Sequence, residues 1–262
     1  MTISAVFMRR LAEIAAAETL PRFRDAGAVA NKLAEGFDPV TEADRETEQA
    51  IRRAIRSEFP EDGILGEEHG LENPASVRRW VIDPIDGTRS FISGIPLWGT
   101  LVGLTVNGDA VAGLMAQPFT REIFYTEDGQ SFYEGPGHQG SGGRQRLSTR
   151  RTPDLAAATL CTTTPAYFKG PSAEAYARLE QKVRLARYGT DCYAYAMVAA
   201  GHVDLVVETG LQPYDIVALI PIIEMAGGVV TAWDGGPAEK GGAIIAAATP
   251  ELHGAASAIL QG

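Results

Sequence analysis

Residues 80–88 read WVIDPIDGT, an apolar run that leads into two carboxylates, a glycine and a hydroxyl. The run Val77–Ile82 predicts a buried strand, and Pro84 predicts that this strand stops at Asp83. Asp83 and Asp86 would repel each other and lose hydration at the tip of a buried strand, so we expect a cation between them. Hard oxygen ligands that share a site favour Mg²⁺ or Mn²⁺.

The next two residues, Gly87 and Thr88, are typical of a phosphate-binding turn. A glycine lets a ligand approach the backbone, and a threonine offers a hydroxyl and an N–H to phosphate oxygens. The stretch therefore predicts a metal-assisted phosphate site. The alternative is a strand followed by an Asp-rich turn that binds nothing.

The composition is typical of a soluble globular enzyme. Of 262 residues, 45% are hydrophobic and 21% charged, and the net charge is −10. That charge argues against nucleic acid or a membrane surface as the main partner, but a small phosphate ester stays compatible because bound metal reverses the local sign.

Cys161 and Cys192 form no CxxC pair, which favours a reducing cytosol. Residues 1–20 predict an amphipathic helix rather than a signal peptide, and no uncharged run is long enough for a bilayer, so we expect a cytoplasmic protein.

The first half predicts two helices and an antiparallel meander. The helices are expected over Ser4–Phe23 and from Thr41 to just before Pro60. Strands 97–106 and 110–117 flank Asn107-Gly108-Asp109, and strands 122–126 and 131–133 flank Asp128-Gly129. Both are hairpin signals. The Gly-rich stretch Gly135–Gly143 predicts a surface loop.

Beyond Arg151 strands and helices alternate, which predicts a layered α/β arrangement. The predicted strands are 159–163, 183–188, 203–208, 229–233 and 243–247, and the predicted helices are 172–182, 192–200, 216–226 and 250–260. We therefore expect an α+β half over residues 1–150 that carries most metal ligands. An α/β half over residues 151–262 would complete the metal site and the substrate pocket.

Three further acids stand beside turn signals. Asp44 lies at the start of a predicted helix and Asp215 just before an apolar one, and either could simply cap its helix. Glu67 belongs to a glutamate pair, which is more often a solvated surface feature.

Together these acids resemble one family. The motifs occur in the order DPVTEAD (38–44), GEE (66–68), DPIDGT (83–88) and YD (214–215), the last before a helix that ends in AGG (226–228). This order, over nearly the whole chain, resembles the inositol monophosphatase-like superfamily of Mg²⁺-dependent, lithium-sensitive phosphatases. Tyr214 departs from it, because the family usually has Trp there.

The resemblance implies a layered αβαβα sandwich, like that of inositol monophosphatase and fructose-1,6-bisphosphatase, in a cytoplasmic homodimer. It implies that Glu67, Asp83 and the Ile85 carbonyl hold a first Mg²⁺. Asp83, Asp86 and Asp215 would hold a second, and a third, weaker ion would bind at Glu67. Mn²⁺ is a possible substitute.

The resemblance also implies the roles around the phosphate. Gly87 and Thr88 would meet it, and Thr88, Asp44 and Glu67 would position and deprotonate the attacking water. Lys32 matches a family lysine near the phosphate; the alternative is a solvated loop lysine. On general chemical grounds, two metals can stabilise both the attacking and the leaving oxygen of an in-line displacement.

The substrate is expected from a second set of residues. The segment GTDCYAY (189–195), the Tyr-Asp motif and PIIE (221–224) resemble the histidinol-phosphatase branch, which belongs to histidine biosynthesis. Glu208 matches a family position that touches the leaving group. Asp191 and Glu208 would suit the ammonium and imidazole of histidinol phosphate. The alternative for Asp191 is an N-cap on the helix 192–200.

Two rival functions stay open. One is another phosphatase of the same superfamily, acting on inositol phosphate, a phosphorylated sugar or a nucleotide. The other is a catalytically inactive metal-binding regulatory protein, which the complete carboxylate set disfavours. The Asp-x-x-Asp spacing argues against a haloacid-dehalogenase-type phosphatase, which needs Asp-x-Asp.

Overall fold

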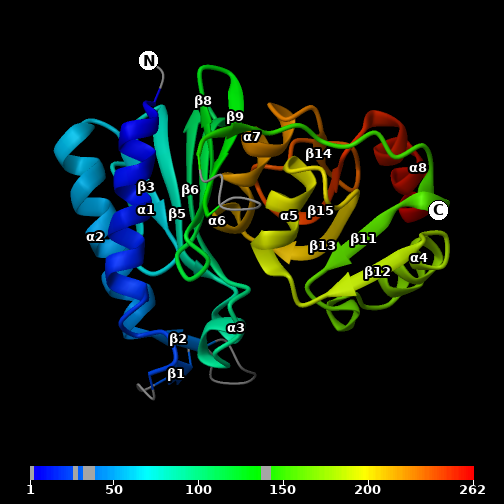
Figure 1. The fold of residues 1–262 in the computed structure, drawn as a ribbon, viewed down its shortest axis with the longest axis horizontal. Helices are drawn as coiled ribbons and strands as arrows, with labels where there is room; N and C mark the ends of the chain where they lie inside the picture. Colours follow the sequence, from blue (N-terminus) through cyan, green and yellow to red (C-terminus); the bar gives the residue numbers. More distant parts are fainter. Residues whose placement is uncertain (1–2, 26–28, 32–38, 137–142) are drawn as a thin grey trace.

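The computed structural model describes residues 3–25, 29–31, 39–136 and 143–262. These residues form five layers in the order helix, sheet, helix, sheet, helix (Figure 1). The expected αβαβα sandwich is therefore confirmed. Within the described residues, no helix combines the length and the apolar character that a membrane crossing requires.

The first layer consists of α1 (Ala5–Thr19) and α2 (Glu42–Glu58), which pack on one face of the larger sheet (Figure 1). α2 begins with a capping box in which Thr41 is the N-cap, as the sequence predicts. α1 ends earlier than predicted, because Pro21 has no N–H to donate to the carbonyl of Ala17.

The larger sheet has eight strands in the order β10-β9-β8-β7-β6-β5-β3-β4. These are β3 (Gly63–Gly66), β4 (Gly70–Glu72), β5 (Arg78–Asp86), β6 (Gly99–Val106), β7 (Asp109–Gln117), β8 (Glu122–Glu127), β9 (Gln130–Glu134) and β10 (Gln145–Arg146). The antiparallel meander is confirmed, and β3 adds a parallel pairing to β5. At the β6–β7 turn, Asn107 and Gly108 have φ of +54° and +101°, the left-handed geometry of a two-residue hairpin. A separate two-stranded sheet contains β1 (Val29–Asn31) and β2 (Pro39–Thr41).

The smaller sheet has five strands in the order β12-β11-β13-β15-β14. These are β11 (Thr159–Thr162), β12 (Leu185–Tyr188), β13 (Leu205–Leu211), β14 (Val229–Ala232) and β15 (Gly242–Ala247). Its outer face is covered by α4 (Pro171–Glu180) and α8 (Pro250–Gln261) (Figure 1). Two short 3₁₀ helices, η2 (Leu155–Ala157) and η3 (Pro165–Tyr167), flank β11. All five strands predicted beyond Arg151 are present, with shifts of a few residues. The division at residues 150 and 151 stays a prediction.

The middle layer contains α5 (Asp191–Ala199), α6 (Pro213–Ile216) and α7 (Leu219–Glu224). The single helix predicted over 216–226 is wrong, because Pro221 has no N–H to donate to the carbonyl of Val217. Gly113 lets the link between α6 and α7 lie directly on the larger sheet. A Cβ there would stand 1.9 Å from the carbonyl oxygen of Ala218. α6 itself contacts β5 and β6.

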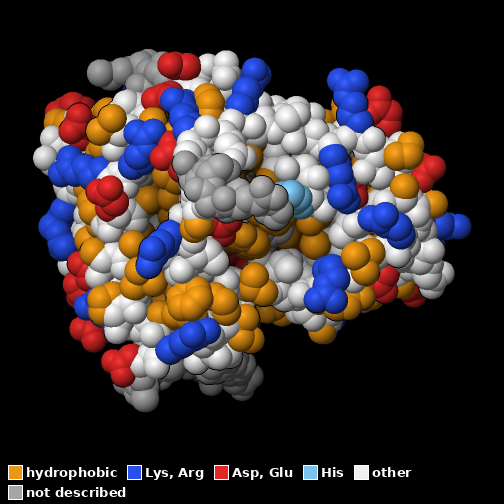
Figure 2. Space-filling model, in the orientation of Figure 1, with side chains coloured by type: hydrophobic (Ala, Val, Ile, Leu, Met, Phe, Trp, Pro, Cys, Tyr) orange, Lys and Arg blue, Asp and Glu red, His pale blue; other side chains and the backbone are white. Residues whose placement is uncertain are grey.

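Charged side chains are dispersed over the surface. On the face shown in Figure 2, Lys and Arg lie scattered among other residue types on both halves. Apolar side chains gather near the junction of the halves on this face.

Candidate active site

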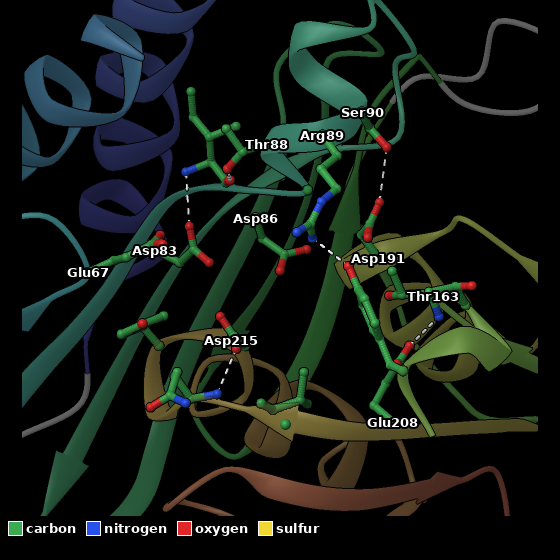
Figure 3. A pocket seen from close by; sticks show the side chains of 18 of the residues that line it. Glu67, Asp83, Asp86, Thr88, Arg89, Ser90, Thr163, Asp191, Glu208 and Asp215 are labelled. Carbon is green, nitrogen blue, oxygen red and sulfur yellow. Dashed lines mark hydrogen bonds between the residues drawn. The ribbon is translucent and has the colours of Figure 1, made fainter. Parts of the chain in front are cut away.

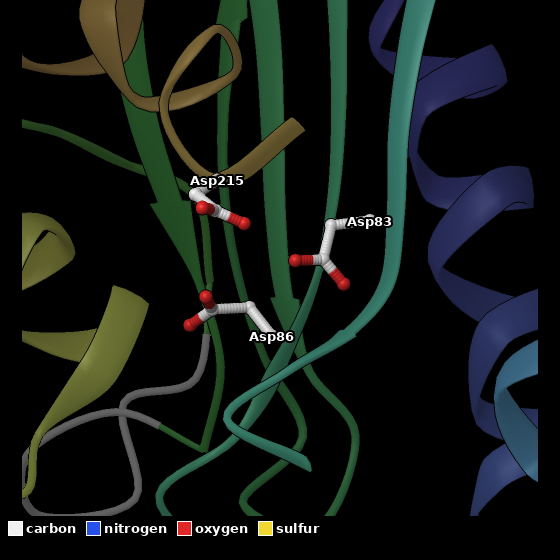
Figure 4. A group of neighbouring side chains, drawn as sticks. All are labelled: Asp83, Asp86 and Asp215. Atoms are coloured by element: carbon white, nitrogen blue, oxygen red, sulfur yellow. The ribbon is translucent and has the colours of Figure 1, made fainter. Parts of the chain in front are cut away.

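The acidic stretch of β5 forms a bulge rather than a strand end. β5 pairs with β6 at Asp83 and again at Asp86, with a register shift between them. The prediction that Pro84 stops the strand is wrong: Pro84 lies in the bulge, where its missing N–H is tolerated. Its carbonyl accepts a 2.7 Å hydrogen bond from Thr100 Oγ1. In a regular strand, residues three apart face opposite sides of the sheet. The bulge lets both carboxylates reach one cluster (Figure 4).

The third carboxylate of this cluster comes from the other half of the chain. Asp215 lies in the first turn of α6, and its Oδ2 accepts a 2.7 Å hydrogen bond from the Gln212 N–H. Oxygens of Asp83, Asp86 and Asp215 all lie within 4.8 Å of one another (Figure 4). Asp215 therefore caps its helix and joins the acidic cluster as well.

Burial and repulsion raise the pKa of both β5 carboxylates well above their usual range. For Asp83 burial is the largest cause, followed by the neighbouring carboxylates, with Glu67 first. For Asp86 burial again comes first, followed by the charges of Asp191 and Asp215. A buried set of anions is unfavourable unless a cation shares it. Because its donors are carboxylate oxygens, the cluster fits a hard divalent cation.

Glu67 stands beside this cluster. It follows β3 directly, and its N–H donates to the carbonyl of Ile82 at 3.2 Å. The parallel pairing of β3 with β5 thus carries Glu67 next to Asp83 (Figure 3). Its role as a ligand stays a prediction.

A tight turn follows the acids. Gly87 has φ of +84°, which favours glycine, and it precedes the short helix α3 (Thr88–Ile92). The Ile85 N–H donates to Asp83 Oδ1 at 3.0 Å, and the Ile85 carbonyl accepts a 3.0 Å hydrogen bond from Thr88 Oγ1. These two hydrogen bonds link Asp83, Ile85 and Thr88 within one turn, and all three residues line the same cavity.

One cavity of about 820 Å³ gathers most of the predicted site residues (Figure 3). The residues predicted from sequence that line it are Glu67, Asp83, Ile85, Asp86, Gly87, Thr88, Asp191, Glu208 and Asp215. Both halves of the chain contribute to its walls.

Asp191 lies at the start of α5 with φ of +43°. The N-cap of α5 is Thr190, so the alternative of Asp191 as the N-cap does not hold. Instead Asp191 Oδ2 accepts a 3.1 Å hydrogen bond from Ser90 Oγ, across the two halves (Figure 3). Burial raises the pKa of Asp191.

Glu208 lies on β13 and is only 3% exposed. Its Oε1 accepts a hydrogen bond from the Thr163 N–H at 2.5 Å, and its Oε2 accepts one from Thr162 Oγ1 at 3.1 Å. Burial raises the pKa of Glu208 to about 7, although these hydrogen bonds oppose the shift.

Several residues that line the cavity were not predicted as site residues, among them Arg89, Ser90, Thr163 and Tyr167. Ser90 and Thr163 hold the two acids just described, and Arg89 donates a short hydrogen bond to Tyr167 Oη. The Arg89 guanidinium also lies 5.7 Å from the centre of the Tyr167 ring, so α3 and η3 are joined beside the cavity. The hydroxyl run at 162–164, at the end of a predicted strand, was the available signal for this wall.

Two predicted site residues remain, Asp44 and Lys32. Asp44 is buried at the third position of α2, outside the described lining of the cavity, and its Oδ2 accepts hydrogen bonds from the N–H and hydroxyl of Thr41 at 2.7 and 2.6 Å. The capping interpretation of Asp44 is thus confirmed, and its catalytic role stays a prediction. Lys32 lies outside the described residues. Tyr214, the departure from the family pattern, lines the cavity.

Comparison with known proteins agrees with this geometry. The family model described as "Inositol monophosphatase family" matches residues 4–261. The chain is 42% identical over 201 residues to the bifunctional phosphatase IMPL2, chloroplastic, of Arabidopsis thaliana, a match that covers 76% of this chain and 56% of that protein. It is 38% identical over 192 residues to a histidinol-phosphatase of Chlorobaculum parvum, covering 72% of this chain and 71% of the relative.

A solved structure extends the comparison to the fold. An inositol monophosphatase from Zymomonas mobilis has a TM-score of 0.85 and 37% identity, covering 99% of this chain and all of that one. The family and these relatives indicate a phosphatase that acts on phosphate monoesters. The chain belongs to the inositol monophosphatase family.

Proposed function

We propose that this chain is a Mg²⁺-dependent phosphatase that hydrolyses histidinol phosphate to histidinol and inorganic phosphate. Family membership supports phosphate monoester hydrolysis; the metal and the substrate are the proposed parts. The observation that supports this choice of substrate is a second pair of acids, Asp191 and Glu208, in the cavity that holds the aspartate cluster.

The metal would be held by oxygen donors that line one cavity, three of which, the aspartate carboxylates, lie within 4.8 Å of one another. The donors are the side chains of Glu67, Asp83, Asp86 and Asp215 and the carbonyl of Ile85. Bound Mg²⁺ would supply positive charge that acidifies water and offsets charge on the leaving oxygen. The raised pKa values of Asp83 and Asp86 support this assignment, because a cation removes the repulsion that causes part of the shift.

The chain's own groups would bind the phosphate and the water. Gly87 has no side chain, so a phosphate oxygen could approach its backbone; a Cβ there would lie 3.1 Å from Asp191 Oδ2. The Thr88 hydroxyl, which now donates to the Ile85 carbonyl, would orient the attacking water. Glu67 would accept its proton, with Asp44 as the further base implied by the resemblance.

The leaving group would lie against Asp191 and Glu208. Histidinol carries an ammonium and an imidazole. A hydrogen bond between a carboxylate and a charged donor contributes roughly 1.5–3 kcal/mol of free energy. A neutral polyol gains less from two acids. The rival substrate is an inositol phosphate, favoured by the similarity to the Zymomonas mobilis protein and by the hydroxyls of Thr163, Thr164 and Thr209 in the wall.

Phosphate release tests the proposal directly. The purified protein is assayed with Mg²⁺ on histidinol phosphate, inositol 1-phosphate, fructose 1,6-bisphosphate and 3′-phosphoadenosine 5′-phosphate. We expect kcat/KM for histidinol phosphate to exceed the others by about tenfold or more, as one charge-assisted hydrogen bond provides. A higher kcat/KM for inositol 1-phosphate would assign the chain to the rival substrate.

A further inference from the structure

We propose that Glu48, which lies outside the cavity, positions the proposed metal ligand Glu67. Glu48 is a positioning residue, because it acts on the turn that follows Glu67 and not on substrate. It lies on α2, one helical turn after Asp44, and its side chain is fully buried. This inference rests on the proposed metal-dependent function.

The Glu48 carboxylate binds the backbone immediately after Glu67. Its Oε2 accepts a 2.7 Å hydrogen bond from the Glu68 N–H, and its Oε1 accepts one of 3.2 Å from the His69 N–H. The His69 ring nitrogen Nδ1 lies 3.3 Å from the same Oε1. The two amides that follow Glu67 are therefore both directed at one side chain.

The space for this carboxylate exists only because residue 66 is glycine. A Cβ on Gly66 would stand 2.0 Å from Glu48 Oε1. No side chain can fit there without displacing Glu48. Gly66 also pairs with Ile82 in β5, so the Glu48 carboxylate lies against β3 at the position aligned with the residue before Asp83.

A buried arginine fixes the other side of Glu48. Arg52 is 3% exposed and its Nε donates to Glu48 Oε1 at 2.7 Å. Its remaining nitrogens bond the Gly70 carbonyl and Glu72, which belong to β4. Glu48 and Arg52 together thus hold both ends of the turn between β3 and β4.

This arrangement has a consequence for the cavity. Glu67 faces the acidic cluster from one side of the turn (Figure 3), while the next two amides are held on α2. A metal ligand on a loose turn would have to be ordered when the ion binds, and that ordering weakens affinity. Outer groups that orient metal ligands typically change metal affinity 10–100-fold when they are mutated.

The group must be a carboxylate. Three donors converge on Glu48, and a carboxylate has two oxygens that only accept. In Glu48→Gln, an amide NH₂ would replace one acceptor and face a backbone N–H or the Arg52 guanidinium. The matched control is Glu72→Gln, which removes the same charge from the same arginine network without bonding the 67–69 turn.

The experiment measures Mn²⁺ binding by isothermal titration calorimetry in the wild type, Glu48→Gln and Glu72→Gln. We expect Kd for Mn²⁺ to rise about 10–100-fold in Glu48→Gln and to stay within about twofold in Glu72→Gln. The concentration of Mg²⁺ that gives half-maximal phosphate release should shift in parallel. An unchanged Kd in folded Glu48→Gln would overturn this inference and leave the proposed function standing.

A second measurement needs no variant and covers the case in which Glu48→Gln fails to fold. Amide hydrogen exchange of the metal-free wild type should show Glu68 and His69 protected well above the exposed β6–β7 turn. Exchange at the rate of that turn would overturn the inference. If the wild type binds no Mn²⁺ at all, the proposed function fails, and this inference fails with it.

Discussion

Asp86 Oδ2 accepts a 2.7 Å hydrogen bond from the backbone N–H of Cys192. Cys192 is the second residue of α5, so a carboxylate of the acidic cluster satisfies a free amide at the start of a helix from the other half. Asp191 stands one residue earlier, and its charge is among the causes that raise the pKa of Asp86. The proposed metal site and the proposed substrate wall therefore meet in one turn of the chain.

Removal of divalent cations should abolish activity. The acidic cluster requires a cation to offset its charge, so EDTA should stop phosphate release and excess Mg²⁺ should restore it. Because only the folded chain assembles these ligands, Mg²⁺ at 100 times its Kd should raise the free energy of unfolding by about 2.7 kcal/mol. Thermal unfolding with and without Mg²⁺ measures this. Full turnover in EDTA would contradict the metal-dependent mechanism.

Asp83→Asn should separate metal binding from folding. Asn retains an acceptor for the Ile85 N–H but loses the charge that binds the metal. Turnover should fall by more than about 100-fold, beyond the loss typical of groups that only orient ligands. The metal-free variant should be as stable as the wild type or more so, because repulsion at a buried site is relieved.

The control is Asp109→Asn in the exposed β6–β7 hairpin, which should change neither turnover nor stability. Urea unfolding and phosphate release measure both properties. If Asp83→Asn keeps near-normal kcat with Mg²⁺, Asp83 is not a ligand.

Asp191→Asn should alter substrate choice and little else. Asn tolerates the φ of +43° at this position and can still accept from Ser90, so only the charge is lost. A charge-assisted hydrogen bond is worth roughly 1.5–3 kcal/mol, so kcat/KM for histidinol phosphate should fall about 10–100-fold. The Tm should barely move.

Glycerol 2-phosphate is the control substrate, because its leaving group is uncharged. Its kcat/KM should change much less in Asp191→Asn. Equal losses on both substrates would point to a disturbed metal site, which the bond from Cys192 to neighbouring Asp86 makes possible. No loss on either would favour the broader phosphatase function.

Local chemistry made much of this fold predictable. The Thr41 capping box and the Asn107-Gly108 hairpin are set by neighbouring residues and appear where expected. Through the family resemblance, the order of the acidic motifs predicted four acids that line one cavity, Glu67, Asp83, Asp86 and Asp215, but also Asp44, which lies outside the described lining. The split between α6 and α7 could also have been predicted, because Pro221 lacks the N–H that a continuous helix needs.

Other features depend on partners far along the chain. The bulge at Pro84 is defined by its pairing with β6, so a strand end and a bulge look alike in the local sequence. The burial of Glu48 follows from where β3 lies against α2, and an isolated glutamate on a helix predicts an exposed face. Ser90 likewise could not be predicted as a site residue, because its partner Asp191 lies 101 residues later in the chain.

The last prediction concerns pH and Glu208. Burial raises the pKa of Glu208 from its ordinary 4.5 to about 7, so the folded protein holds a neutral carboxyl below that pH and a charged one above it. If the charge attracts the cationic leaving group, KM for histidinol phosphate should fall as pH rises from about 6 to 8. The substrate's imidazole titrates nearby, at about 6.5, so the wild type must be compared with Glu208→Gln on the same substrate.

In Glu208→Gln the amide oxygen still accepts from the Thr163 N–H, and the amide NH₂ can donate to the Thr162 hydroxyl, which rotates to accept. The KM of Glu208→Gln divided by that of the wild type should therefore grow with pH and level off above about 8.

The pH dependence of the free energy of unfolding tests the same titration independently. A carboxyl with a raised folded pKa binds more protons in the native state, so the wild type should lose stability relative to Glu208→Gln as pH rises from 4.5 to about 7. Urea unfolding at several pH values measures this difference. A KM ratio that is flat with pH, together with the expected stability trend, would show that Glu208 titrates as described but does not contact the leaving group.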